Sequence, residues 1–147
     1  MKKLIDLNRW AAEKLLTLKE APLFFIRLVL AYGFMNPALM KIKNINDIAE
    51  WFSGMDIPFP LINAYLAAYT ELVGFIFLAL GFATRIITVP LLFVMLVAIK
   101  TVHWENGFEA GNNGYEIPLY YILMLFTLLV YGPGKWSLDY LISKKAA

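Results

Sequence analysis

Four long apolar stretches, separated by short polar segments, dominate the pattern of this 147-residue chain. They extend over roughly residues 21–40, 61–83, 86–103 and 117–131. A membrane-spanning helix needs about 20 mostly apolar residues, at about 1.5 Å rise per residue. Within each stretch the apolar residues are continuous and do not alternate with polar ones, and four strands cannot close a barrel. The pattern therefore predicts an all-α fold, a four-helix transmembrane bundle whose fourth span is the shortest.

The N-terminal segment carries a different pattern. Five apolar residues recur there at helical spacing, with lysines and acids between them: Leu4, Leu7, Ala11, Leu15 and Leu18. This spacing predicts an amphipathic interfacial helix on the membrane surface; the alternative is a charged tail that only fixes topology. The segment lacks the uninterrupted apolar core of a signal peptide. We therefore divide the chain into a cytoplasmic amphipathic segment (1–19), a membrane domain (20–140) and a cytoplasmic tail (141–147).

Prolines, glycines and asparagines predict where the spans begin and end. The two prolines of residues 57–60 cannot continue a helix and mark the start of the second span. The sequence Gly-Asn-Asn-Gly at 111–114 predicts a turn before the fourth span, and Gly-Pro-Gly at 132–134 ends that span. Between the first two spans, residues 44–52 carry the pattern of a short helix across the outer surface.

Composition supports the membrane assignment and excludes several kinds of chemistry. Apolar residues make up 61% and charged residues 16%, and so small a domain cannot hide that much apolar surface from water. The net charge of +2 is too small to indicate nucleic-acid binding. Without cysteine there are no disulfides, thiolate metal sites or iron–sulfur ligands, and a single histidine, His103, excludes an intrachain bis-histidine haem. We therefore predict neither a metal nor a haem from this chain alone, and no nucleotide-binding motif is present.

The distribution of Lys and Arg predicts the orientation of the spans. Nine of them fall on the side that carries the termini: Lys2, Lys3, Arg9, Lys14, Lys19, Arg85, Lys135, Lys144 and Lys145. The other side holds Lys41 and Lys43 in the first loop, with Lys100 near the end of the third span. The positive-inside rule then places both termini in the cytoplasm.

Glu71 is the most informative residue because it lies near the middle of the second span. A charge at mid-bilayer costs at least about 2.5–3.5 kcal/mol, so it persists when it is paired, wetted or functional. The residues that share its helix face are mostly small: Ala67, Gly74, Leu78 and Gly81. Small residues mark the face where membrane helices approach closely. We therefore predict that Glu71 points into the bundle and that Ala67, Gly74 and Gly81 pack against neighbouring helices.

Two cationic residues are candidates to form an ion pair with Glu71: Arg27 in the first span and Lys100 in the third. His103 shares a face with Lys100, and Glu116 opens the fourth span, so these three would meet near the outer mouth. One interpretation is an internal salt bridge that fixes helix register. The other is a polar pocket for a proton-coupled ligand such as a quinone, whose carbonyls need donors and whose reduction needs protons. The candidates for ligand binding and proton relay are Arg27, Glu71, Lys100, His103 and Glu116, and the tyrosines that would line an aromatic wall are Tyr65, Tyr69, Tyr120 and Tyr121.

These polar positions, taken together, resemble the DoxX family of small four-helix bacterial membrane proteins over nearly all of residues 22–140. The resemblance rests on Arg27, Glu71, Gly74, His103 and Glu116 together with further motif residues: Lys41, Gly81, Thr84, Arg85, Gly132, Pro133, Gly134, Lys135, Trp136, Ser137, Leu138 and Asp139. Two positions depart from the family pattern. Asn36-Pro37 stands where the family often has a glycine, and Val73-Gly74 stands where it often has two glycines. Either change affects the region between the first two spans.

The resemblance implies a protein of the bacterial cytoplasmic (inner) membrane with a redox association. Family members are linked to a thiosulfate:quinone oxidoreductase and to oxidative-stress and thiol-handling proteins. We therefore expect a redox-associated subunit that binds quinone or a similar lipid-soluble ligand, contacts the lipid bilayer and has redox partner proteins. Whether it is an enzyme, as a subunit of a quinone-linked oxidoreductase, stays open. The alternatives are a non-catalytic membrane scaffold or assembly factor, and a small solute transporter that acts as a homo-oligomer because four spans leave little room for alternating access.

Overall fold

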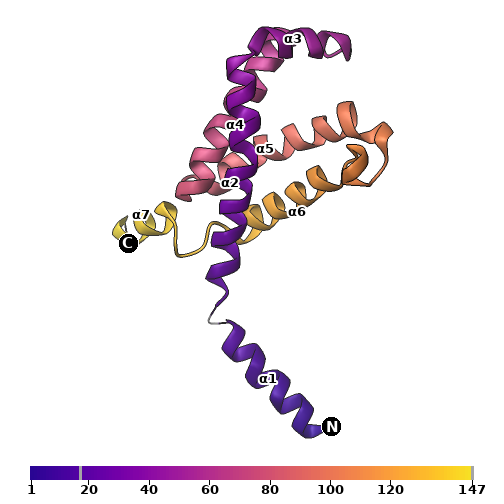
Figure 1. Cartoon of the computed structure of the whole chain (residues 1–147). Coiled ribbons are helices and arrows are strands. Elements are labelled where there is room, and N and C mark those ends of the chain that lie inside the picture. Colours follow the sequence, from indigo (N-terminus) through magenta and orange to yellow (C-terminus); the bar gives the residue numbers. More distant parts are fainter. Residues whose placement is uncertain (17, 147) are drawn as a thin grey trace.

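The computed structural model describes residues 1–16 and 18–146, apart from the side chains at positions 2, 4, 11 and 146 (Figure 1). Over these residues it has seven α-helices and no strand, which confirms the predicted all-α fold. The elements in chain order are α1 (Lys2–Leu16), α2 (Glu20–Lys43), α3 (Ile45–Gly54), α4 (Pro60–Leu80), α5 (Thr84–Ala98), the π-helical turn η1 (Ile99–His103), the short 3₁₀ turns η2 (Trp104–Asn106) and η3 (Ala110–Asn112), α6 (Glu116–Tyr131) and α7 (Leu138–Ala146).

Three helical segments are long and apolar enough to cross a membrane: α2, α4 and the continuous stretch Thr84–Asn106 that α5 begins. The fourth apolar helix, α6, has 16 residues. At 1.5 Å per residue it is about 24 Å long, somewhat less than the hydrocarbon thickness of about 30 Å. The structure therefore confirms three long spans and a shorter fourth apolar helix.

The predicted interruptions coincide with the observed helix ends. α4 begins at Pro60, the second of the two prolines. It ends at Leu80, short of the expected limit near residue 83, because Gly81 takes a left-handed conformation (φ +65°). α6 follows a turn in which Asn113 is left-handed (φ +59°), and it ends before Gly132 (φ +80°). The short helix expected between the first two spans is α3. These breaks are local because proline cannot donate within a helix and glycine tolerates positive φ.

The four apolar helices run alternately in opposite directions (Figure 1). We call the end that carries the start of α2, the α4–α5 link and residues 132–139 the termini side, and the end that carries α3 and residues 104–115 the loop side. α2 packs along α4, α5 pairs with α6, and α3 lies across α4 at the loop side. α1 extends away from the bundle on the termini side; the side chains of Leu4 and Ala11 in its expected apolar stripe lie outside the described residues. Its position on a membrane surface stays a prediction.

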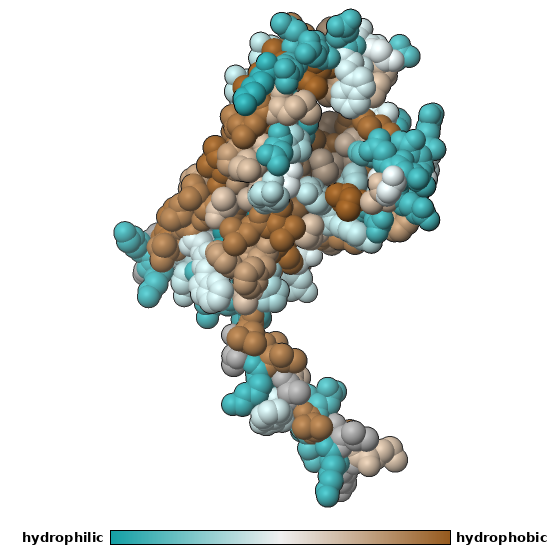
Figure 2. Space-filling model, viewed as in Figure 1, coloured by the Kyte–Doolittle hydropathy of each residue, from teal (hydrophilic) through white to brown (hydrophobic). Residues whose placement is uncertain are grey.

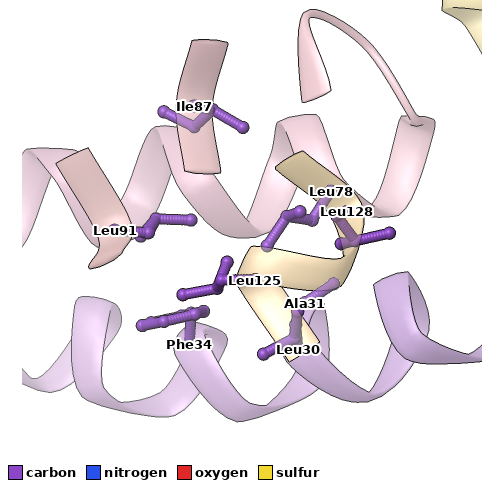
Figure 3. Packing of buried hydrophobic residues seen from close by; sticks show 8 residues of the cluster. All are labelled: Leu30, Ala31, Phe34, Leu78, Ile87, Leu91, Leu125 and Leu128. Carbon is purple, nitrogen blue, oxygen red and sulfur yellow. The ribbon is translucent and has the colours of Figure 1, made fainter. Parts of the chain in front are cut away.

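One apolar cluster joins all four helices (Figure 3). Its buried members are Leu30, Ala31 and Phe34 of α2, Leu78 of α4, Ile87 and Leu91 of α5, and Leu125 and Leu128 of α6. Figure 2 shows hydrophobic side chains over much of the visible surface of α2 and α4, and hydrophilic ones gathered at α3 and at the segment that joins α5 to α6. Since lipid is as apolar as the cluster, close packing and polar contacts between helices have to hold the bundle together.

Candidate functional site

Glu71 is held by a lysine on the neighbouring helix. It lies on the buried face of α4 with 3% of its side chain exposed, and Lys41 reaches it from the last turn of α2 with 13% exposed. Lys41 Nζ donates to both carboxylate oxygens, at 2.9 Å from Oε1 and 2.7 Å from Oε2. The two opposite charges thus satisfy each other inside the bundle and tie α2 to α4.

This pairing differs from the partners that the sequence suggested for Glu71, which were Arg27 and Lys100. Lys41 was expected in the first loop, but α2 continues to Lys43 and carries Lys41 as a helical residue. A signal for this was present, because one face of α2 has the spacing four, three, four, three through Arg27, Ala31, Phe34, Ala38 and Lys41. Lys41 therefore continues the face that the structure buries.

Arg27 lies at the termini side and has partners of its own. It is almost fully buried, with 1% exposed. Its Nη1 donates to the carbonyl oxygen of Leu78 at 3.2 Å, and its Nη2 donates to the carbonyl oxygen of Trp136. A Cβ on Gly81 would lie 2.2 Å from Nη1, so the glycine leaves the space that the guanidinium fills. Arg27 thereby joins α2 to the end of α4 and to the segment after α6.

The other two small residues predicted on the face of Glu71 differ in their surroundings. Gly74 is buried, and a Cβ at this position would lie 2.7 Å and 2.9 Å from the two Cδ atoms of Leu91. The missing side chain therefore lets α5 approach α4 closely. Ala67 is half-buried one turn before Glu71.

Asp139 fastens the start of α5. Its Oδ1 accepts the N–H of Ala83 at 2.7 Å and its Oδ2 accepts the N–H of Thr84 at 3.0 Å. The first N–H groups of a helix lack partners within the helix, and a carboxylate there also meets the positive end of the helix dipole. Ala83 is left-handed (φ +45°), a conformation that a residue with a Cβ adopts at some cost, and these bonds help to hold it.

The motif residues of the C-terminal segment complete this termini-side cluster. Ser137 Oγ donates to the carbonyl oxygen of Gly134 at 2.5 Å and accepts the N–H of Tyr140 at 3.2 Å, so it caps α7. Arg85 Nη2 donates to the carbonyl oxygen of Val130 at 3.1 Å, where α6 ends before Gly132 and Pro133. Residues far apart in the sequence therefore meet at one end of the bundle.

A half-open groove of about 260 Å³ lies at the loop side, between α2, the end of the third span and the start of α6. Residues that line it include Gly33, Pro37, Met95, His103, Asn113 and Tyr121. Tyr121 places its hydroxyl against α2, since a Cβ on Gly33 would lie only 1.9 Å from it. Pro37 has no N–H, so the carbonyl oxygen of Gly33 lacks the donor that an α-helix normally supplies. The groove is thus lined by apolar residues together with Tyr121 and His103, and the Gly33 in its wall carries a carbonyl oxygen that lacks its usual helical donor.

His103 reaches this groove from η1, a π-helical turn, and such turns occur frequently at functional sites. Its Nδ1 lies 2.8 Å from the carbonyl oxygen of Asn113. A carbonyl can only accept, so Nδ1 carries the hydrogen and, in the neutral ring, Nε2 is an acceptor.

The five candidate residues occupy separate places in the bundle. Arg27 lies at the termini side, Glu71 pairs with Lys41, and Lys100 is exposed on η1 beside His103. Glu116 orders the segment before α6, because its Oε1 accepts from Tyr120 Oη at 2.7 Å and its Oε2 accepts the N–H of Ala110 at 3.0 Å. Among the residues that the structure describes, no group of three His, Asp or Glu side chains gathers as metal ligands. A ligand-binding role for any of the five stays a prediction.

The comparison with known families decides what kind of chain this is. A family model described as DoxX matches residues 22–104, more than half of the chain. The chain belongs to the DoxX family. The matched part of this DoxX protein includes Arg27, Lys41, Glu71 and His103, whereas α6 and the C-terminal segment lie beyond it.

Two relatives of this DoxX protein are similar over most of their length. An uncharacterized protein of Haemophilus influenzae is 35% identical over 126 residues, which cover 83% of this chain and 83% of the relative. An uncharacterized membrane protein of Mycobacterium tuberculosis is 32% identical over 132 residues, or 82% of this chain and 81% of the relative. No solved structure matches. The DoxX chain is therefore a multi-pass membrane protein. The names of the two relatives state no activity.

Proposed function

We propose that this protein is a redox-associated membrane subunit that binds a quinone or a similar lipid-soluble carbonyl compound in the loop-side groove. The observation that carries the proposal is the lining of that groove, where the polar side chains of Tyr121 and His103 stand among apolar residues and beside Gly33. Ligand pockets are mostly apolar and hold a few convergent polar groups that fix orientation. The expected ligand thus enters from the lipid and is held by its oxygens.

The hydrogen-bonding groups at the groove fit both the oxidised and the reduced form of such a ligand. The Tyr121 hydroxyl can donate to a ligand carbonyl, and it makes no hydrogen bond within the described part of the chain. The Gly33 carbonyl and the His103 Nε2 can accept from a ligand hydroxyl. A positioned histidine and tyrosine can also move protons. The electrons would come from a partner protein, because the chain has no cysteine thiol that could be oxidised to supply them.

Buried charged side chains fix the position of α2, which forms part of the groove wall. Lys41 and Glu71 fasten α2 to α4, and Arg27 fastens the other end of α2 to Leu78 and Trp136. α2 is the helix that carries Gly33 and Pro37 into the groove. We therefore assign Arg27 and Glu71 a positioning role, in which they hold the groove wall without touching the ligand.

Identification of co-purified lipids tests the proposal. The protein is purified in mild detergent, and its bound lipids are extracted and quantified by mass spectrometry beside Tyr121→Phe, His103→Gln and the control Tyr120→Phe. Tyr120 is the adjacent tyrosine, bonds to Glu116 and is absent from the groove lining. We expect about one quinone per chain in the wild type and the control, and roughly tenfold less in the other two variants, because each loses a buried hydrogen bond.

Two outcomes would contradict the proposal. If the variants keep the thermal stability of the wild type and contain as much quinone as it does, Tyr121 and His103 do not hold the quinone. Bulk phospholipid alone in the wild type would favour the non-catalytic scaffold, and cross-linking of partner proteins would then be the next measurement. In that case Lys41 and Glu71 serve stability only, and their loss lowers the unfolding temperature without changing any ligand signal.

A further inference from the structure

A second groove, of about 520 Å³, opens at the termini side, at the opposite ends of the helices from the loop-side groove. The first turn of α5, the end of α6, residues 132–135, α7 and the start of α2 form its walls. α4 and α6 both end here, at Leu80 and Tyr131. In a bilayer this is the level at which the apolar spans give way to lipid headgroups.

Two cations line this termini-side groove, and both keep donors available. Arg85 uses Nη2 for the carbonyl oxygen of Val130, while its Nε and Nη1 donate to no group in the described part of the chain. Lys135 is bonded through its backbone N–H, and its Nζ has no bond to any residue described. An arginine and a lysine that share a groove are suited to bind the oxygens of a phosphate.

The two carboxylates of the groove differ in how many of their oxygens already accept hydrogen bonds. Asp139 has both oxygens on the N–H groups of Ala83 and Thr84. Glu20 accepts the N–H of Lys135 with Oε2 at 2.7 Å, which leaves Oε1 as an acceptor. The groove therefore offers cationic donors together with one carboxylate oxygen, which is a match for a ligand that carries a phosphate and an ammonium group.

An apolar strip leads from this groove along the outside of α5. Ile86 lines the groove, and Val89 and Phe93 follow it at helical spacing, with 76%, 56% and 68% of their surfaces exposed. Tyr131, 72% exposed, and Tyr140 lie at the groove edge, where aromatic rings favour the membrane interface. A ligand with a charged head and an apolar tail could occupy the groove and the strip together, whereas a soluble phosphate would use the groove alone.

We propose that the termini-side groove binds the headgroup of an amine-bearing phospholipid. Arg85 and Lys135 hold the phosphodiester, Glu20 Oε1 accepts from the ammonium group, and an acyl chain lies along Ile86, Val89 and Phe93. This site is independent of the quinone proposal, because it lies at the other end of the bundle and uses none of the same residues.

Lipid addition to the delipidated full chain tests this site. Phosphatidylethanolamine, phosphatidylcholine and phosphatidylglycerol are added separately in detergent, and binding is followed by native mass spectrometry and by the unfolding temperature. We expect phosphatidylethanolamine to bind best, because a quaternary ammonium has no N–H for Glu20 and a glycerol headgroup has no ammonium. Lys135→Gln and Arg85→Gln should each weaken its binding by about tenfold, since each loses a charge-assisted hydrogen bond.

Lys144→Gln is the matched control, because it removes the same charge from α7 without lining the groove. Lys135→Gln carries the test if Arg85→Gln fails to fold, since Lys135 Nζ makes no bond in the described part of the chain. Equal binding of the three lipids, or an equal loss in Lys144→Gln and Lys135→Gln, would overturn the proposal. Displacement of the lipid by millimolar inorganic phosphate would overturn it as well, because the site would then be one for soluble phosphate.

Discussion

Lys41 and Glu71 form a two-point ion pair between the last turn of α2 and the middle of α4, with Nζ–oxygen distances of 2.9 Å and 2.7 Å. Both side chains are largely hidden from solvent. In such surroundings the attraction between the partners is strong, but each charge was costly to bury. The pair therefore stabilises the bundle only while both members are present, because loss of one leaves the other as an unpaired buried charge.

Removal of one member of this pair should destabilise the bundle strongly. We expect Lys41→Met and Glu71→Gln each to lower the free energy of unfolding by about 3–5 kcal/mol, the range for breaking a buried pair. The double variant Lys41→Met/Glu71→Gln should lose less than the two single losses added together. Reversible unfolding in detergent micelles, followed by tryptophan fluorescence, measures these differences.

Lys43→Met is the control for the ion-pair prediction, because Lys43 lies on the same helix but is exposed. It should shift the free energy of unfolding by no more than about 0.5 kcal/mol. Equal stability of Lys41→Met and Lys43→Met would contradict a stabilising role for the pair.

Gly81→Ala should be more harmful than an ordinary glycine substitution. Gly81 ends α4 at φ +65°, and a Cβ there would lie 2.2 Å from Arg27 Nη1 and 2.6 Å from Ser137 Cβ. Backbone strain and displacement of the guanidinium together should cost about 2 kcal/mol or more. Gly54→Ala serves as the comparison, since nothing lies within 4 Å of a Cβ at that position. Similar unfolding temperatures for the two variants would rule out the crowding at Arg27.

Gly74→Val should overfill the contact between α4 and α5. A Cβ at Gly74 meets the Cδ atoms of Leu91, which is fully buried and cannot turn away. The expected cost is about 1–3 kcal/mol. In a double-mutant cycle, Leu91→Ala should cost less in the Gly74→Val background than in the wild type, because the shortened side chain restores the space. Additive effects would show that the two residues do not compete for the same volume.

The orientation predicted from Lys and Arg can be tested by thiol labelling, because the chain has no cysteine of its own. Gly54→Cys at the end of α3 and Lys144→Cys in α7 place single exposed thiols at the loop side and the termini side. In intact cells a membrane-impermeant maleimide should label Gly54→Cys and leave Lys144→Cys unlabelled until the membrane is permeabilised. The reverse pattern would contradict cytoplasmic termini.

Two limits of the spans were predictable because they depend on local chemistry. Pro60 at the start of α4 and Gly132 after α6 mark helix ends in the sequence and in the structure. The burial of Glu71 also followed from the sequence, because a carboxylate among small residues on an apolar helix can only face other helices. The same reasoning misplaced Lys41, since the end of an apolar run was taken as the end of the helix.

The sequence by itself determined that this is an all-α chain with apolar spans and that charges lie within them, because backbone hydrogen bonding in lipid and the length of each apolar run are properties of single segments. Only the tertiary structure decided that Lys41 pairs with Glu71. It also decided that Arg27 donates to the carbonyl oxygens of Leu78 and Trp136, and that Tyr121 packs against Gly33. These contacts depend on how far each helix is shifted and rotated against its neighbour. That arrangement is set by the packing of all four helices at once, so no single segment of the sequence specifies it.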